Sequence, residues 1–393
     1  SVGLYFQYGY VPSSHCIFEQ THKVRAGQIL VIDLPQNTSR YQKYWSILDS
    51  FSQPIVKQYH PESFLLRELD QRLDTACQTR MTADHPIGLY LSGGYDSSLV
   101  AYYARKHSNF HKAYCLGFEE NEYSEVPFAQ QIAQYLNIPL EGFILENRES
   151  LYLTTQLPEV FDEPFGDSSA VACLALSQRV RSSVKAVVSA EGGDELWAGY
   201  PRYVQSLRLF QGLKYAPSSV VRVLLKSFKH RKCVKLRHIL SHPQNPLWIL
   251  DAVSQSLSSN LVPSLVQDFS PNSENTFRKA FPNDPIHAML YWDYSQYLVD
   301  DLMVKADRTG MAVGLEIREP MLHHPWVEWV SGLPSQYKIN GSEQKYLLKK
   351  LAHQKIPQAL LDRPKKGFGV PLSKWLRGSL KELVLDTLTT SAL

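Results

Sequence analysis

The stretch Ser92-Gly-Gly-Tyr-Asp-Ser-Ser98 carries residue types that bind phosphate groups. Its two glycines let the backbone close around phosphate oxygens without interference from a Cβ atom, and its three serines supply hydroxyl donors. Asp96 would repel a bare phosphate, so it predicts either a bound Mg²⁺ or a tight backbone turn. The alternative is a plain glycine turn followed by a helix with a serine cap.

The residues on either side of this stretch predict the elements that would position it. Ile87–Leu91 is a short apolar run that ends in glycines, which is typical of a buried strand. Asp96 then opens a helical pattern. A strand, a glycine turn and a helix together present free backbone N–H groups and a positive helix end to an anion. The loop is not a Walker A motif, because the Gly-Lys-Ser/Thr ending is missing.

A second candidate stretch follows an apolar run and places three carboxylates, Glu191, Asp194 and Glu195, in one glycine-containing loop after Ser189. Like charges so close together are unfavourable unless a metal ion, a lysine or a proton balances them. The alternative is a solvated acidic loop before a helix, whose N-terminus accepts acidic residues.

Two further stretches carry charges in helical patterns. Within Tyr297–Leu322 the charged residues interrupt apolar ones at helical spacing, which predicts a helix with a polar inner face or, alternatively, exposed ion pairs. Lys345 stands at a predicted helix start, where a cation is poorly placed for the helix dipole. It therefore indicates an anionic partner, although a surface lysine is the simpler alternative.

The middle of the chain alternates strand and helix patterns. This alternation predicts an α/β fold with a doubly wound parallel sheet and a ligand at the carboxyl ends of the strands. We expect the α/β core at 86–200, a helix before it from Pro61 to about Gln78, and a mainly helical region at 201–393 in which 214–285 includes a connecting segment. The expected strands are 87–91, 113–117, 140–144 and 185–189, and the expected helices 97–107, 124–136 and 168–182.

The composition limits the class of protein. The 393 residues are enough for two domains, and 44% hydrophobic with 20% charged residues is ordinary for a globular protein. A net charge of +3 gives no indication of a nucleic-acid or anionic membrane partner. The five cysteines are scattered and the chain has no 18-residue apolar run. We therefore predict a cytoplasmic protein without a disulfide framework.

The phosphate-type loop is similar to the SGGxDSS pyrophosphate loop of ATP-pyrophosphatase enzymes (the adenine nucleotide α-hydrolase-like type). Together the four stretches resemble the asparagine synthetase family in its bacterial, glutamine-dependent form. Further matches run through the chain in order: Gly117-Phe-Glu119, Tyr123-Ser-Glu125, Asp162-Glu-Pro-Phe165, Asp167-Ser-Ser169, Asp300-Asp-Leu302, Asp307-Arg308, Glu316-Ile-Arg-Glu-Pro320 and Arg363-Pro-Lys-Lys-Gly-Phe368. In this resemblance, 51–393 is the synthetase domain and 1–50 is the tail of a glutaminase domain.

The resemblance implies roles for individual residues. Catalysis would fall to Glu191, which takes a proton from attacking ammonia, and to Lys345, which stabilises charge on the transferring phosphate. Asp96 and Asp194 would ligate Mg²⁺. ATP and its pyrophosphate would be bound by Leu91, Ser92, Gly93, Gly94, Asp96, Ser97, Ser98, Leu116, Gly117, Ser189 and Ala190. Substrate-binding candidates are Asp162, Glu163, Asp301, Asp307 and Arg308.

The implied reaction activates the side-chain carboxylate of aspartate with ATP, giving β-aspartyl-AMP and pyrophosphate, after which ammonia displaces AMP. A related enzyme that adenylates another carboxylate, in polysaccharide or natural-product assembly, would carry the same ATP motifs. A non-catalytic nucleotide-binding scaffold is the alternative from another class. A tRNA-thiolating relative is not favoured, because the chain has no cysteine pair and no strongly basic patch.

The chain departs from the family at several positions. The N-terminal cysteine nucleophile of the glutaminase is not found: the chain starts Ser1-Val2-Gly3, and its first cysteine is Cys16. We therefore expect a fragment or one part of a split enzyme, which takes free ammonia or receives it from a glutaminase domain or subunit. Milder changes occur near the expected site at Ala190, Tyr95 and Trp197. They leave the identity of the acceptor carboxylate open but do not affect the expected ATP chemistry. A homodimer remains open.

Overall fold

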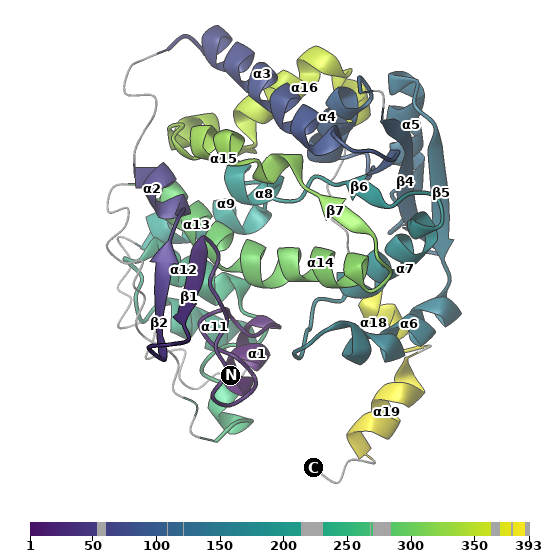
Figure 1. Ribbon diagram of the computed structural model, residues 1–393. Helices are drawn as coiled ribbons and strands as arrows, with labels where there is room; N and C mark the ends of the chain where they lie inside the picture. Colours follow the sequence, from purple (N-terminus) through teal and green to yellow (C-terminus); the bar gives the residue numbers. More distant parts are fainter. Residues whose placement is uncertain are drawn as a thin grey trace.

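The computed structural model (Figure 1) places a parallel sheet on the right of the view and a mostly helical region on the left. It describes residues 1–52, 60–107, 109–120, 122–213, 231–267, 269, 284–362, 370–378 and 380–389. The segment Arg363–Phe368 and most of the expected connection, namely 214–230, 268 and 270–283, lie outside these ranges. Within the expected connection, 231–267 contains helices. Among the described residues, no helix combines the length and the apolar character needed to cross a bilayer.

Five parallel strands form the central sheet in the order β5-β4-β3-β6-β7. The chain therefore starts in the middle of the sheet, moves to one edge, and returns to build the other half, so the sheet is doubly wound as predicted. The strands are β3 (Ile87–Tyr90), β4 (Phe110–Phe118), β5 (Leu140–Leu145), β6 (Ala186–Val188) and β7 (Glu316–Arg318). The strand order reverses between β3 and β6, and the carboxyl ends at such a switch point are the usual ligand site of an open α/β sheet.

Alternate strand residues point into two different cores, which is why both faces of the sheet carry helices. Leu89 and Val188 belong to one cluster with the helices α3 (Glu62–Met81), α4 (Tyr95–Ala104), α5 (Val126–Leu136) and α16 (Tyr346–Lys355). Tyr114 and Val187 belong to a second cluster with α6 (Asn147–Val160) and α7 (Ser169–Arg181). Burial on both faces explains why these strands read as continuous apolar runs in the sequence.

The remaining elements form the helical part and the N-terminal segment, with a two-residue hairpin of β8 (Ile339–Asn340) and β9 (Glu343–Gln344) before α16. The π-helix η4 (Leu298–Leu302) runs directly into the helix that starts at Met303, and the 3₁₀ turn η5 (Pro320–Leu322) follows β7. The other helices are α1 (Val2–Tyr8), α2 (Ile47–Ser52), α8 (Gly193–Trp197), α9 (Pro201–Leu213), α11 (Arg231–Ile239), α12 (Pro246–Ser254), η2 (Val262–Ser264), α13 (Pro285–Ser295), α14 (Met303–Met311), α15 (His324–Ser331), η6 (Ser335–Tyr337), α17 (Gln358–Leu361), α18 (Leu372–Trp375) and α19 (Lys381–Thr389).

The fifth strand is a finding that the sequence patterns did not predict. β7 comes from the region expected to be mainly helical, and it pairs with β6 in parallel, Val188 opposite Arg318. Its Arg318 guanidinium binds Glu316 through two nitrogens, at 2.9 and 3.2 Å, and donates to the carbonyls of Arg80 and Thr82 at 3.0 and 2.9 Å. A cation at these carbonyls caps the C-terminal end of α3, so Arg318 fixes the edge strand to that helix.

Residues 1–50 form the predicted hairpin, β1 (Gln28–Asp33) and β2 (Thr38–Lys43), after the short helix α1. The segment contacts the rest of the chain through polar side chains. Tyr8 donates to Asp251 at 2.8 Å, and the indole of Trp45 donates to Glu328 at 2.9 Å. The boundary at residue 50 stays a prediction.

Candidate active site

The loop after β3 has the geometry that a phosphate-binding turn requires. The hydroxyls of Ser92 and Ser97 are 2.9 Å apart, and the Gly94 N–H donates to Ser92 Oγ at 3.3 Å. Gly93 has φ +78°, and a Cβ atom there would lie 2.8 Å from the carbonyl carbon of Phe128. Only glycine fits such a position, so the loop is pressed against the start of α5. Ser98 Oγ is buried, and it has no hydrogen-bond partner among the described residues.

Lys345 joins the two loops that the sequence singled out. Its Nζ pairs with Asp96, from the first turn of α4, and lies 2.6 Å from Oδ1 of Asp194, from α8. The residue precedes α16 with φ +56°, and its backbone N–H donates to the carbonyl of Trp197 at 3.1 Å. Burial alone would lower the pKa of Lys345, but Asp194 and Asp96 hold this pKa above its ordinary value. The ammonium therefore stays charged in a site where it is only 5% exposed.

Two glycines make this close approach possible. A Cβ atom on Gly193 would lie 2.8 Å from Cγ of Asp96, and one on Gly199 would lie 1.8 Å from Oδ1 of Asp194. Both distances are shorter than a van der Waals contact. Gly193, at the start of α8, and Gly199, after its end, therefore allow the two carboxylates to pack around one cation.

Asp96 and Asp194 also fit a magnesium ion that accompanies ATP. Asp96 Oδ1 is buried without a hydrogen-bond partner among the described residues, and both carboxylates already converge on one cation. The described residues contain no group of three or more metal-binding side chains. Mg²⁺ is commonly held by one or two carboxylates together with substrate phosphates, so the pair is compatible with this ion, and the assignment stays a prediction.

The three carboxylates of the acidic loop are balanced in different ways. Asp194 pairs with Lys345. Glu195 is 1% exposed, and burial, followed by the charge of Asp194, raises its pKa. Its carboxyl accepts a hydrogen bond from the Tyr200 hydroxyl at 2.6 Å. The backbone N–H of Glu191 donates to Oε2 of Glu319 at 3.0 Å.

A buried lysine on α14 forms a second polar cluster beside Glu191. Lys305 Nζ lies 2.7 Å from Asp167 and 2.9 Å from Oγ of Ser169. Burial lowers the pKa of Lys305, but the neighbouring acidic groups, Asp167 first, raise it above the ordinary value. The polar inner face predicted for this helix is therefore present.

Of the residues that the resemblance assigns to ATP binding, those outside the Ser92–Ser98 loop lie at the carboxyl ends of the central strands. The Leu91 N–H donates to the Tyr114 carbonyl, and the Ser189 N–H to the Arg318 carbonyl, both at 2.9 Å. Leu116 is buried, and a Cβ atom on Gly117 would lie 2.3 Å from Oγ of Ser124. Ala190 follows Ser189 and packs against the larger core. These positions surround the switch point, and the assigned contacts to ATP stay predictions.

The candidate substrate-binding residues divide into three places. Arg308 lies 2.8 Å from Asp162 and also pairs with Asp307, in a largely exposed group. Glu163 accepts from the Ile17 N–H at 2.8 Å and thereby holds the N-terminal segment. Asp301 is buried, and its pKa is raised by burial and then by the charge of Asp167.

Sequence reasoning did not assign Lys305, Asp167 and Glu319 to the site. All three lie in stretches matched to the family, and Lys305 was part of the charged helical pattern. The sequence did contain one indication for Lys305, namely a charged residue among apolar residues at helical spacing. Only the fold shows its partner, because Asp167 is 138 residues away.

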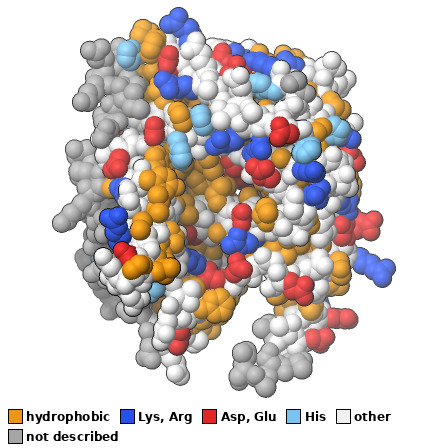
Figure 2. Space-filling model, in the orientation of Figure 1, with side chains coloured by type: hydrophobic (Ala, Val, Ile, Leu, Met, Phe, Trp, Pro, Cys, Tyr) orange, Lys and Arg blue, Asp and Glu red, His pale blue; other side chains and the backbone are white. Residues whose placement is uncertain are grey.

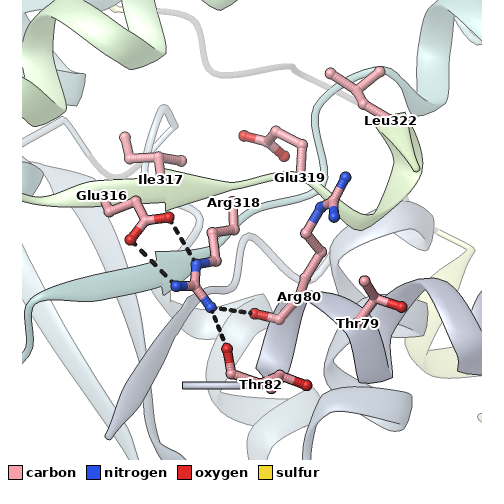
Figure 3. A pocket seen from close by; sticks show the side chains of 8 residues that line it. All are labelled: Thr79, Arg80, Thr82, Glu316, Ile317, Arg318, Glu319 and Leu322. Carbon is pink, nitrogen blue, oxygen red and sulfur yellow. Dashed lines mark hydrogen bonds and ion pairs between the residues drawn. The ribbon is translucent and has the colours of Figure 1, made fainter. Parts of the chain in front are cut away.

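A cavity of about 570 Å³ runs along the free edge of β7 (Figure 3). Its wall includes Glu319, so it lies next to the Glu191 loop. Thr79 and Arg80 of α3 form the facing wall. On the molecular face shown in Figure 2, acidic and basic side chains alternate, and neither sign covers a large area.

A doubly wound parallel sheet with a phosphate-type loop at its switch point defines a nucleotide-binding protein of the ATP-pyrophosphatase type. The family model described as asparagine synthase matches residues 68–393, and the chain belongs to this family.

Individual relatives agree with this assignment. The chain is 27% identical to glutamine-hydrolyzing asparagine synthetase 1 of Bacillus subtilis, over 98% of this chain and 61% of that protein. It is 30% identical to a putative glutamine-hydrolyzing asparagine synthetase of Mycobacterium tuberculosis, over 82% of this chain and 51% of that protein. It is also 21% identical to the amidase chry2 of Gibberella zeae, over 96% of this chain and 62% of that protein. The chain thus spans between half and two thirds of the length of these relatives.

Proposed function

We propose that the chain is the synthetase part of an AMP-forming amide ligase, which activates a carboxylate with ATP and joins it to ammonia. The acceptor we favour is the side-chain carboxylate of aspartate, so that the products are asparagine, AMP and pyrophosphate. The proposal keeps the domain boundaries expected from the sequence, in which the synthetase domain is 51–393.

One observation carries this proposal: Lys345 contacts both Asp96 and Asp194. A lone phosphate-type loop is a weak signal. A buried, permanently charged ammonium between that loop and a second acidic loop is much more specific. It supplies positive charge where the phosphate of ATP would gain negative charge, which is what electrostatic preorganisation requires.

The remaining residues would divide the work as follows. The N–H groups and hydroxyls of the Ser92–Ser98 loop bind the leaving pyrophosphate. Asp96 and Asp194 hold Mg²⁺, which supplies positive charge to the phosphates. Glu191 accepts the proton that ammonia sheds as the amide forms. A carboxylate has no usable leaving group, so the preceding transfer to AMP is necessary.

A related acceptor is the second candidate, and one observation favours keeping it. Relatives named amidases match almost the whole chain at 21 and 22% identity. Ammonia would come from solution or from a glutaminase domain or subunit.

The test is pyrophosphate release from ATP and Mg²⁺ with ammonium, comparing aspartate, a panel of other carboxylic acids, and no acid. Release that needs aspartate and yields asparagine supports the favoured acceptor. Release with another acid supports the related enzyme. Nucleotide binding without release under all these conditions would contradict the ligase proposal and favour a scaffold.

A further inference from the structure

We propose that Glu319 is a positioning residue that holds the Glu191 loop in its working conformation. Glu319 acts through Glu191 and does not itself contact the reacting groups. The kinetic part of this inference rests on the proposed ligase function, whereas its structural part does not.

The contact joins two elements that are far apart in the chain. Oε2 of Glu319 accepts the backbone N–H of Glu191 at 3.0 Å, across a separation of 128 residues. Glu319 directly follows the edge strand β7, and Pro320 begins the turn η5 behind it. Figure 3 shows the Glu319 side chain on the side of β7 opposite the Arg318–Glu316 ion pair. The acid is therefore not part of the group that caps α3.

The same segment holds the loop at two neighbouring points. The Ser189 N–H donates to the Arg318 carbonyl at 2.9 Å. Gly192 has φ +88°, and a Cβ atom there would lie 2.3 Å from Cδ2 of Leu322. Residues before and after Glu191 are thus fixed by packing and backbone pairing, and the Glu319 carboxyl fixes Glu191 itself.

A carboxyl at this position requires a reason, because burying a polar group is costly unless it forms hydrogen bonds. Glu319 is 8% exposed, and its Oε1 has no hydrogen-bond partner among the described residues. Burial, and then the charge of Glu191, raises the pKa of Glu319 to about 8, while the hydrogen bonds with the Glu191 N–H and with Ser189 oppose the shift. At neutral pH the group is therefore protonated. It accepts the Glu191 N–H without adding a second negative charge beside that residue.

This protonation state supplies a matched pair of variants. Glu319→Gln keeps the shape of the protonated acid and a carbonyl oxygen that can accept the N–H. Glu319→Val places a compact, apolar side chain at this position and removes the acceptor. Asp251→Asn is the control, because Asp251 is another buried carboxyl with a raised pKa and lies in the helical part, bound to Tyr8 and Gln255.

Amide hydrogen exchange tests the structural part without any assumption about activity. In the full chain without ligands, we expect the Glu191 amide to exchange roughly tenfold faster in Glu319→Val, as loss of one hydrogen bond predicts. Glu319→Gln and Asp251→Asn should leave its rate within about twofold of wild type. Unchanged exchange in Glu319→Val, or equal acceleration in the Val and Gln variants, would overturn the inference.

Kinetics test the consequence. With the acceptor that the wild type uses, Glu319→Val should lower the kcat of amide formation about tenfold or more, because a displaced general base is inefficient. The KM for ATP should stay within about twofold, and Glu319→Gln should restore most of the kcat. A Val variant with wild-type kcat, or one that loses kcat and ATP affinity together without rescue by Gln, would contradict positioning. If the wild type itself forms no amide, the ligase proposal fails, and the exchange result still decides the structural part.

Discussion

Lys345 and Asp96 form a largely buried ion pair across 249 residues of sequence. The pair joins the loop after β3 to the start of α16. Because Asp194 contacts the same ammonium, three chain segments meet at one charged atom. The proposed chemistry depends on this meeting point, and the first prediction follows from it.

Replacing Lys345 by methionine should abolish most pyrophosphate release. The side chain keeps its length but loses the charge, and loss of one preorganised charge-stabilising group lowers kcat by about 10²- to 10³-fold. Lys350→Met is the matched control, since Lys350 lies on the same helix and pairs with Glu62 at 39% exposure. Steady-state assays of both variants check this. More than about a tenth of wild-type activity in Lys345→Met would exclude the assigned role.

Gly93→Ala should destabilise the fold, whereas Gly94→Ala should not do so appreciably. At Gly93 the new Cβ atom would meet the Phe128 backbone at 2.8 Å with φ +78°, which predicts a loss of about 2–4 kcal/mol. At Gly94 the nearest atom is Ser92 Oγ at 3.5 Å and φ is −78°, so about 1 kcal/mol or less is expected. Urea unfolding of both variants measures the difference. Equal midpoints would show that the loop is not pressed against α5.

Lys305→Met should lower the unfolding free energy more than Arg308→Met does, because the ion pair of Lys305 is largely buried and that of Arg308 is exposed. Lys305→Met leaves the carboxylate of Asp167, which is 20% exposed, without its ion-pair partner and with only Ser169 as a donor. Breaking a largely buried pair in this way costs about 3 kcal/mol. The Arg308 side chain is 42% exposed and its partner Asp162 is 72% exposed, so its loss should cost about 1 kcal/mol or less. Unfolding free energies at pH 7 check the two values. A reversed order would mean that the Lys305 cluster is solvated.

Asp251 should make stability fall as the pH rises from about 4 to about 6. Burial raises its pKa from 3.8 to about 6, so the folded chain keeps a proton that the unfolded chain releases. Below both values the residue contributes no pH dependence. Above both it costs the fold about 3 kcal/mol. The unfolding free energy of wild type minus that of Asp251→Asn should therefore decrease through this window. A constant difference would contradict the shift.

The sequence predicted the local elements well because their signals are local. Ile87–Leu91 is a short, apolar run between polar residues, and the predicted strand corresponds to β3. The other three predicted strands also correspond to β4, β5 and β6. β7 was missed because its three residues, Glu316, Ile317 and Arg318, are exposed or half-buried and form no apolar run. Pairing with β6, rather than any pattern of its own, makes this segment a strand.

The candidate site was predicted only where residue type was informative by itself. Asp96 stood out because an acid in a phosphate-type loop would repel phosphate, and Asp194 because three carboxylates share one loop. Lys345 stood out because a cation is poorly placed at a helix start. Glu319 did not, because its significance comes from the Glu191 N–H that it accepts. Such contacts depend on how distant segments pack, and sequence spacing contains no information about them.

The late position of β7 in the chain has a consequence for synthesis on the ribosome. β6 is buried along its whole length in the finished fold, and its outer edge is covered by β7. A nascent chain that has released β6 but not yet Glu316 carries an apolar strand with an unpaired backbone edge, which is a template for intermolecular pairing. The helices between β6 and β7 are therefore synthesised before the sheet is complete. During this stage of synthesis the growing polypeptide most needs protection from aggregation.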